Sequence, residues 1–141
     1  MPYTTSASKI IHAPIQKVWD ALTKPEQVKE YFFGTNLVTD WKVGSPIFFR
    51  GEWEGKTYED KGIVLSFNPT ASLSYSYFSA MSGAAETPEA YQTLQYDLTE
   101  TSEGTMVSIT QSNVQTQEKA DHSQGNWQMV LGKLDEYLHR S

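Results

Sequence analysis

The chain has 141 residues, of which 38% are hydrophobic, 13% aromatic and 20% charged, and its formal net charge is −6. This length suits a single domain with its own core, predicted over residues 1–141. An acidic chain without a basic run argues against nucleic acid as a partner. Because the sequence contains no cysteine, a disulfide framework, a cysteine-ligated metal and a thiol nucleophile are excluded.

Membrane insertion and export are not expected from this sequence. No stretch approaches 18 consecutive apolar residues, so no membrane span is predicted. Residues 1–6 lack the basic and apolar regions of a secretory signal. We therefore expect a cytoplasmic protein.

A strand over residues 3–12 and two helices are predicted at the start of the chain. The first helix has apolar residues at positions i, i+3, i+4 and i+7, which form one stripe. Pro14 suits its first turn, and Pro25 ends it, because proline disfavours a helical residue before it. A short second helix is predicted over residues 25–32. The stripe consists of Ile15, Val18, Trp19 and Leu22.

The middle of the chain alternates apolar and polar residues with a period of two, which is typical of strands. Short connections with turn residues, such as those around Gly55 and Gly104, indicate antiparallel pairing. Two polar or small-residue segments, 80–90 and 115–125, are predicted to be mobile loops. The predicted strands cover residues 47–53, 57–67, 73–77, 92–100 and 106–113.

A second amphipathic helix is predicted at the end of the chain. It is the only large element available to cover one face of the sheet. The predicted fold class is therefore α+β: a curved antiparallel sheet of about six or seven strands wrapped around a long C-terminal helix, with two short helices after the first strand. The helical stripe consists of Trp127, Val130, Leu131, Leu134 and Leu138.

Three stretches carry a resemblance to a known family. The first is Ala13-Pro14-Ile15-Gln16-Lys17-Val18-Trp19-Asp20-Ala21-Leu22-Thr23. The second is Trp41-Lys42-Val43-Gly44 with Gly62-Ile63-Val64, Pro69 and Leu73-Ser74-Tyr75-Ser76-Tyr77. The third is Gly125-Asn126-Trp127 with Leu131, Leu134, Tyr137 and Leu138. In this order they resemble the family related to the C-terminal domain of the activator of the heat-shock-protein-90 ATPase, within the START-like helix-grip superfamily.

The chain departs from the family pattern at two positions. The family often has tryptophan where Tyr77 stands, and it usually has Gly and Trp adjacent where Asn126 intervenes here. The resemblance implies a START-like ligand-binding domain with a pocket between the sheet and the last helix. It does not name a function, because one fold supports many activities.

No catalytic residue, metal site or cofactor is predicted. His12, His122 and His139 have neither the helical spacing nor the motif of a metal site, and we interpret them as exposed or capping residues. A nucleophile elbow and a Gly-rich phosphate loop are both absent from the sequence.

The charged residues of the middle strands are interpreted mainly as surface residues. Glu52, Glu54, Glu59 and Asp60 surround a hairpin turn and are interpreted as a solvated hairpin rather than a calcium site. Arg50 is interpreted as an outer-face residue that pairs with a surface acid, with capture of a ligand carboxylate as the alternative.

Aromatic residues carry the strongest functional signal. Their number exceeds the need of a few core positions, and strand parity places several on one face. We predict that they line a pocket for an apolar or amphipathic small molecule, with a solid core as the alternative. We interpret the segment 80–90 as an ordinary flexible loop, with gating of the entrance by this segment and Phe33 as the alternative. The predicted ligand-binding residues are Phe33, Phe49, Trp53, Tyr58, Tyr75, Tyr77, Trp127 and Val130.

Three functions remain open at this point. If the protein binds or carries a small molecule, we expect an apolar cavity of at least about 300 Å³. An enzyme of the cyclase, dehydratase or hydrolase kind would need an acid–base pair among Tyr58, Tyr75, Tyr77 and Asp60. If it is instead a protein-binding module, we expect a filled interior and an exposed apolar patch. The resemblance also suggests a co-chaperone that stimulates a chaperone ATPase. The full activator, however, carries a separate docking domain, for which we expect no room within these 141 residues. The oligomeric state is not predicted.

Overall fold

The computed structural model describes residues 3–32, 34–53, 55–78, 87 and 90–140, with the backbone alone for Trp53, His139 and Arg140. The chain forms seven strands and three helices in these ranges. They are β1 Tyr3–Ile11, α1 Ile15–Thr23, α2 Pro25–Tyr31, β2 Asn36–Val38, β3 Pro46–Trp53, β4 Lys56–Asn68, β5 Ser72–Tyr77, β6 Gln92–Thr101, β7 Gly104–Val114 and α3 Gln117–Arg140.

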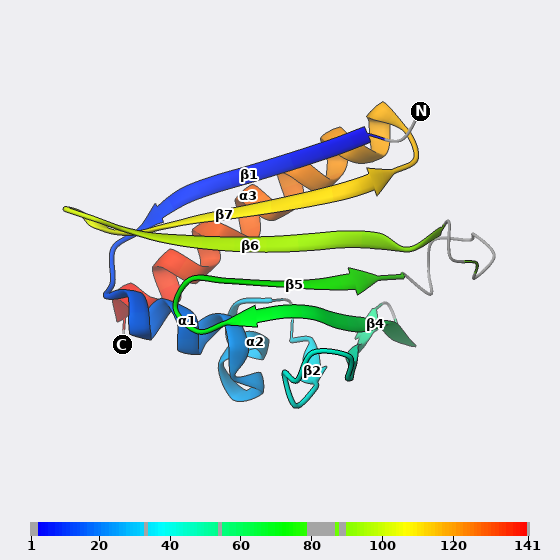
Figure 1. Cartoon of the computed structure of the whole chain (residues 1–141), viewed down its shortest axis with the longest axis horizontal. Helices are drawn as coiled ribbons and strands as arrows, with labels where there is room; N and C mark the ends of the chain where they lie inside the picture. Colours follow the sequence, from blue (N-terminus) through cyan, green and yellow to red (C-terminus); the bar gives the residue numbers. More distant parts are fainter. Residues whose placement is uncertain (1–2, 33, 54, 79–86, 88–89, 141) are drawn as a thin grey trace.

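The strands form one curved sheet with the order β1-β7-β6-β5-β4-β3-β2 (Figure 1). All six neighbouring pairs are antiparallel. The helix α3 crosses one face of the sheet diagonally, and α1 and α2 lie together near its C-terminal end. The predicted helix-grip architecture is therefore confirmed. The strand β2, which is only three residues long, was not predicted.

The two short helices form where the sequence predicts them. Pro14 precedes α1, and Lys24 ends it with an extended backbone and an N–H donated to the Asp20 carbonyl. Pro25 is the first residue of α2. Its ring cannot continue the preceding helix, so two helices form instead of one. This break matters for the site, because it directs α2 and the residue after it towards the sheet.

Strand parity separates an inner and an outer face of the sheet. On β3, Ile47 and Phe49 are buried while Arg50 is exposed.

On β4, Gly62 lies so close to β5 that a Cβ atom there would come 1.6 Å from the Ser76 carbonyl oxygen. Only glycine therefore permits β5 to approach β4 this closely.

The helix α3 is longer than the sequence analysis expected. The segment 115–125 was predicted to be a mobile loop, and this is wrong, because the helix begins at Gln117. Thr116 caps its first turn by accepting hydrogen bonds from the Lys119 N–H at its hydroxyl (3.1 Å) and the Ala120 N–H at its carbonyl (3.0 Å). Farther along, Gln124 donates to the Ser6 carbonyl on β1. Capping and contact with β1 hold a polar segment in a helix that its apolar pattern alone does not favour.

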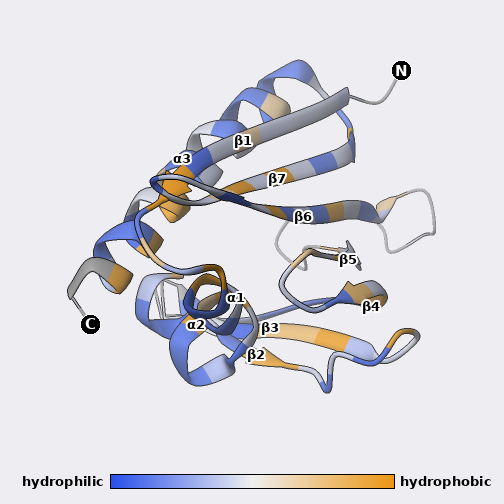
Figure 2. Cartoon of the chain, turned by 60° about the vertical axis from the view of Figure 1, so that its left-hand side comes forward, coloured by the Kyte–Doolittle hydropathy of each residue, from blue (hydrophilic) through white to orange (hydrophobic). Residues whose placement is uncertain are grey.

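The C-terminal half of α3 carries the main aliphatic packing. Leu131 and Leu134 are fully buried, and α3 packs chiefly along β1. Figure 2 shows this change along the helix, from mainly hydrophilic colours near its start to strong hydrophobic colour nearer the end. No helix in the described part of the chain is long and apolar enough to cross a membrane.

Candidate ligand-binding site

Five aromatic side chains form a closed circle between the sheet and the helices. Ring centroids are 6.5 Å apart for Phe32 and Phe49, 5.4 Å for Phe49 and Tyr75, and 5.7 Å for Tyr75 and Tyr96. Tyr96 and Trp127 are 6.1 Å apart, and Trp127 returns to Phe32 at 5.7 Å. All five separations fall within the range of favourable aromatic pairs. We call these residues the aromatic circle.

The members of the aromatic circle differ in how deeply they are buried. Phe49, Tyr75 and Tyr96 project from strands and are 7%, 2% and 6% exposed. Phe32 follows the last residue of α2, and Trp127 projects from α3; both are only partly buried. The circle is therefore made of three fixed rings on the sheet and two more exposed rings on the helical side.

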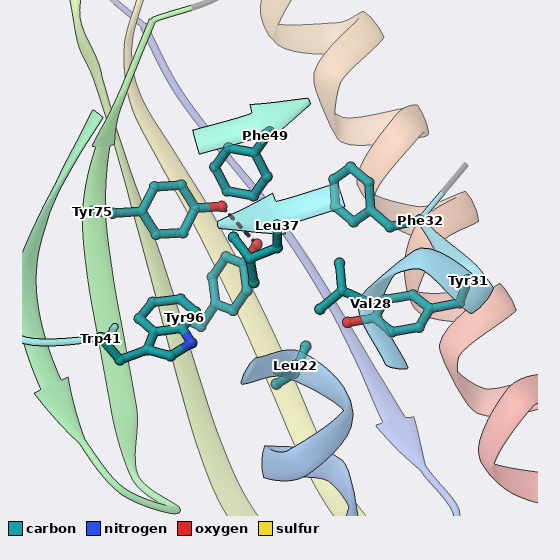
Figure 3. Close-up of a pocket in the computed structure, with 9 residues that line it drawn as sticks. All are labelled: Leu22, Val28, Tyr31, Phe32, Leu37, Trp41, Phe49, Tyr75 and Tyr96. Atoms are coloured by element: carbon teal, nitrogen blue, oxygen red, sulfur yellow. Dashed lines mark hydrogen bonds between the residues drawn. The ribbon is translucent and has the colours of Figure 1, made fainter. Parts of the chain in front are cut away.

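A small cavity lies beside the aromatic circle (Figure 3). Its volume is about 10 Å³, which is room for about one water molecule. This is far below the ~300–1,000 Å³ of ordinary ligand pockets. The space between these lining residues is therefore almost filled by their side chains in this conformation. The lining residues are Leu22, Val28, Tyr31, Phe32, Leu37, Trp41, Phe49, Tyr75 and Tyr96.

The buried tyrosine hydroxyls are hydrogen-bonded and neutral. The hydroxyls of Tyr75 and Tyr96 are 2.8 Å apart, and Tyr31 donates to the Ala21 carbonyl at 2.8 Å. Burial raises the pKa of all three tyrosines well above the ordinary value. They therefore act here as hydrogen-bonding groups and not as bases.

A row of polar side chains crosses the inner face at the end of the sheet where β5 and β7 finish. Tyr77 donates to the Asp60 carboxylate at 2.6 Å. On the neighbouring strands, the side-chain amide of Gln111 donates to that of Gln92, which lies opposite Tyr77 in the sheet register. Gln111 also accepts a 2.9 Å hydrogen bond from the Trp127 indole N–H. We call Asp60, Tyr77, Gln92 and Gln111 the polar row.

The polar row adjoins the aromatic circle directly. Trp127 belongs to the circle and bonds to the row, and the Tyr77 ring lies 5.9 Å from that of Phe49. Asp60 faces Phe49 in the pairing of β3 with β4. Asp60 and Gln111 are only 9% and 7% exposed. The interior therefore has an apolar part and an adjacent buried polar part.

Several predicted site residues meet in this arrangement. Phe49, Tyr75 and Trp127 belong to the aromatic circle, and Tyr77 contacts it. Val130 is 2% exposed and lies in the hydrophobic core. Phe33 and the segment 80–90, apart from positions 87 and 90, lie outside the described residues, as does the side chain of Trp53.

Tyr58 lies over β3, separate from the circle. Its hydroxyl is 2.9 Å from the Thr35 hydroxyl. A Cβ atom at Gly51, the residue opposite Tyr58, would come 2.5 Å from the Tyr58 hydroxyl. Glycine at this position therefore makes room for the ring.

Two members of the aromatic circle were missing from the predicted site. Tyr96 shares its strand face with Leu94 and Leu98, all of which are buried. The same alternation that placed Tyr75 inside could have placed Tyr96 there too. Phe32 has no comparable signal, because its position depends on how α2 ends against the sheet.

The charged residues divide between the two faces. Arg50 donates to Glu59 on the outer face at 2.6 Å and lies 4.7 Å from the Phe48 ring, so the interpretation as a surface pair is confirmed. Asp60 was expected on a solvated hairpin, and this is wrong, because its parity on β4 turns it inward. His12 is exposed and contacts Asp135. Among the described residues, no group of three acidic or histidine side chains could hold a metal ion.

A separate apolar patch lies on the outside of the molecule. Ile63 and Leu65 on β4 are 47% and 46% exposed, and Val43, in the loop before β3, is 66% exposed. The Gly44 N–H donates to the Val64 carbonyl, which holds that loop beside β4. We call Val43, Ile63 and Leu65 the outer patch.

The curved sheet, the long C-terminal helix and the enclosed aromatic interior define a START-like helix-grip protein. The family described as Activator of Hsp90 ATPase homolog 1-like protein matches residues 12–139. The chain belongs to this family. A search of curated proteins gave no match.

Solved structures agree with this assignment. The protein ChR145 from Cytophaga hutchinsonii is 44% identical, with a TM-score of 0.85 over 98% of this chain and 94% of that one. The Aha1 dimer from Colwellia psychrerythraea is 20% identical, with a TM-score of 0.72 over 95% and 94%. DynU16, a putative protein in the dynemicin biosynthetic locus, is 19% identical, with a TM-score of 0.80 over 96% of this chain and 47% of that one. The last two show the shared fold alone.

Proposed function

We propose that this protein binds an apolar or amphipathic small molecule between the sheet and α3. The observation that carries the proposal is the construction of the aromatic circle. Three rings are fixed on strands, and the two that close it, Phe32 and Trp127, stand on the helical side and are partly exposed. When these two turn outward, the ligand takes their place against Phe49, Tyr75 and Tyr96.

The small cavity requires such an opening. A volume of about 10 Å³ admits no organic ligand, whereas a cavity on the order of 150 Å³ in an apolar core binds benzene. Displacing even one aromatic ring creates space of that order. The open conformation is then a minor state that a ligand stabilises by binding it preferentially.

The polar groups of the interior suit a largely apolar ligand. One structural neighbour that shares this fold is a putative protein in the dynemicin biosynthetic locus. The buried hydroxyls of Tyr75 and Tyr96 add polar groups that can orient a largely apolar molecule.

The test uses the neutral fluorescent probe N-phenyl-1-naphthylamine. We expect the wild-type protein to bind it with increased fluorescence. We expect Phe32→Ala to bind it at least tenfold more tightly, because the cost of displacing that ring is removed. Met129→Ala is the matched control, since Met129 lies on α3 but is 50% exposed; its affinity should equal that of the wild type.

Folding is checked by circular dichroism before each titration. Native mass spectrometry of the freshly purified protein, followed by denaturing extraction, tests independently for a co-purified apolar molecule. If folded wild type and folded Phe32→Ala both fail to bind the probe, and no molecule is extracted, the proposal is wrong.

The outer patch supports a second candidate function, a contact between two copies of this chain. Ile63 and Leu65 are exposed on β4, and Val43 is exposed in the loop held beside that strand. A contiguous exposed apolar patch can mark a protein–protein contact, and one structural neighbour is described as a dimer. We expect light scattering to show a dimer whose dissociation constant rises at least tenfold in Ile63→Lys. A monomeric wild type at about 100 μM would exclude this contact as a stable interface. Stimulation of a chaperone ATPase, which the family description suggests, ranks below both candidates.

A further inference from the structure

The hydrogen bonds of Gln111 restrict what can replace Trp127. The Gln111 amide N–H already donates to Gln92, and its carbonyl oxygen accepts the Trp127 indole N–H at 2.9 Å. The Gln111 side chain is 7% exposed, so water does not readily replace a lost partner. When Trp127 turns outward, the group that loses its partner is therefore a buried acceptor.

An unpaired buried acceptor is costly. Leaving such a group without a donor costs about 1–3 kcal/mol. A ligand that fills only the apolar space would leave this cost uncompensated. A ligand whose polar group donates a hydrogen bond would replace the Trp127 N–H and recover it. The opening of the circle thus selects for a donor at one end of the ligand.

A carboxylate head group would not meet this requirement. An ionised carboxylate can only accept hydrogen bonds, so it cannot donate to the Gln111 carbonyl oxygen and would leave that acceptor unpaired. It would also lose its hydration beside a residue that is 7% exposed. The space left by Trp127 therefore disfavours an anionic head group.

We infer that the ligand is an amphipathic molecule with a hydrogen-bond-donating head group, a hydroxyl or an amine, which binds Gln111 in place of the Trp127 N–H. Its apolar part lies against Phe49, Tyr75 and Tyr96. Anionic amphiphiles such as fatty-acid carboxylates are disfavoured, because an ionised carboxylate has no hydrogen to donate to Gln111. This inference rests on the proposed function and specifies the ligand class of the same site.

The experiment compares three compounds with the same eight-carbon tail. Octan-1-ol, octylamine and sodium octanoate compete with N-phenyl-1-naphthylamine for wild-type protein near pH 7, where the carboxylic acid is ionised. We expect the alcohol and the amine to displace the probe at concentrations at least tenfold lower than octanoate. Equal potency of all three, or stronger displacement by octanoate, would overturn the inference.

Two substitutions test the assigned acceptor. Gln111→Met removes the acceptor at similar size and should reduce the preference for octanol over octanoate at least fivefold. Gln111→Glu keeps an acceptor oxygen and should retain the preference. Gln128→Met is the matched control, because Gln128 is exposed on α3, and its ratio should equal that of the wild type. An unchanged ratio in folded Gln111→Met would contradict the role of Gln111.

The outcomes also separate this inference from the proposed function. If the probe binds and the three head groups compete equally, the binding function stands and the ligand class is wrong. If the probe does not bind to any folded variant, the proposed function fails first. The wild-type comparison decides the ligand class even where a Gln111 variant does not fold.

Discussion

The core of this protein has two halves built from different side chains. Around β1, the first part of β7 and the end of α3, the buried residues are mainly aliphatic, and Ile11, Val107, Leu131 and Leu134 are 0% exposed. Around β3 to β6, α2 and the middle of α3, the interior includes the aromatic circle and the polar row. Its rings range from 2% exposure at Tyr75 to the partly exposed Phe32.

The two halves therefore suit different roles: the aliphatic half stabilises the fold, and the aromatic half can rearrange around a ligand. Branched aliphatic side chains interlock, and any void among them costs free energy directly. Aromatic rings at the margin of a core can rotate on one or two bonds and expose a flat face to a ligand. Among the described residues, no buried side-chain nitrogen or oxygen lacks a partner, so the aromatic half is also the one whose polar groups must be satisfied again after any rearrangement.

The largest expected effect comes from the aliphatic half. Leu134→Ala should lower the free energy of unfolding by about 2–5 kcal/mol, because it leaves a cavity in a fully buried site. Urea denaturation measures this loss. The affinity of the folded variant for N-phenyl-1-naphthylamine should stay within twofold of the wild type.

Phe32→Ala provides the contrast in the aromatic half. It should change the probe affinity strongly and stability less than Leu134→Ala does, since Phe32 is only partly buried. If Leu134→Ala altered probe affinity as much as Phe32→Ala, the two halves would not be functionally separate.

An effect of intermediate size is expected at alkaline pH. Burial raises the pKa of Tyr31, Tyr75 and Tyr96 in the folded protein, whereas in the unfolded chain they ionise near pH 10. The unfolded state therefore binds fewer protons above that pH, and stability falls as pH rises. The slope is about 1.4 kcal/mol per pH unit for each such group.

Denaturation in urea at several alkaline pH values measures this slope. Tyr96→Phe removes one of the three groups and should make the slope shallower by about one-third. Tyr3→Phe, at a residue 39% exposed on β1, is the control and should leave the slope unchanged. Identical slopes in all three proteins would show that Tyr96 is not held neutral by the fold.

The fold was predictable because its signals are local and repeated. The stripe of α1, the period-two alternation of the long strands and the Pro25 break each specify one element on their own. The strand β2 and the first two turns of α3 were missed for a common reason. A three-residue strand has too few positions to show alternation, and residues 117–125 are helical through a cap at Thr116 and contact with β1.

The site was predictable only in part, because parity places a residue on a face but not next to a partner. Phe49 and Tyr75 followed from alternation, and Trp127 from the helical stripe. The Tyr77–Asp60 bond and the Gln111–Trp127 bond join residues that are 17 and 16 positions apart. Such bonds depend on sheet register and on the angle of α3, which no spacing in the sequence reports.

The smallest expected effect concerns the contact that fastens α3 to the end of β1 in the aliphatic half. Asp135, whose side chain is 19% exposed, accepts a 3.0 Å hydrogen bond from the His12 backbone N–H and lies 3.3 Å from its ring nitrogen. Burial would raise the pKa of Asp135, but the hydrogen bonds from His12 and the charges of His12 and Lys9 outweigh it and hold the pKa below its ordinary value. The stabilisation is therefore present above about pH 4 and is lost as pH falls through the lowered pKa.

Asp135→Asn should lower the free energy of unfolding by at most ~1 kcal/mol at neutral pH. It should also flatten the acid limb of the curve of stability against pH. Asp121→Asn, on the exposed side of the same helix, is the control. An acid limb unchanged in Asp135→Asn would mean that the contact between Asp135 and His12 does not contribute to the acid dependence of stability.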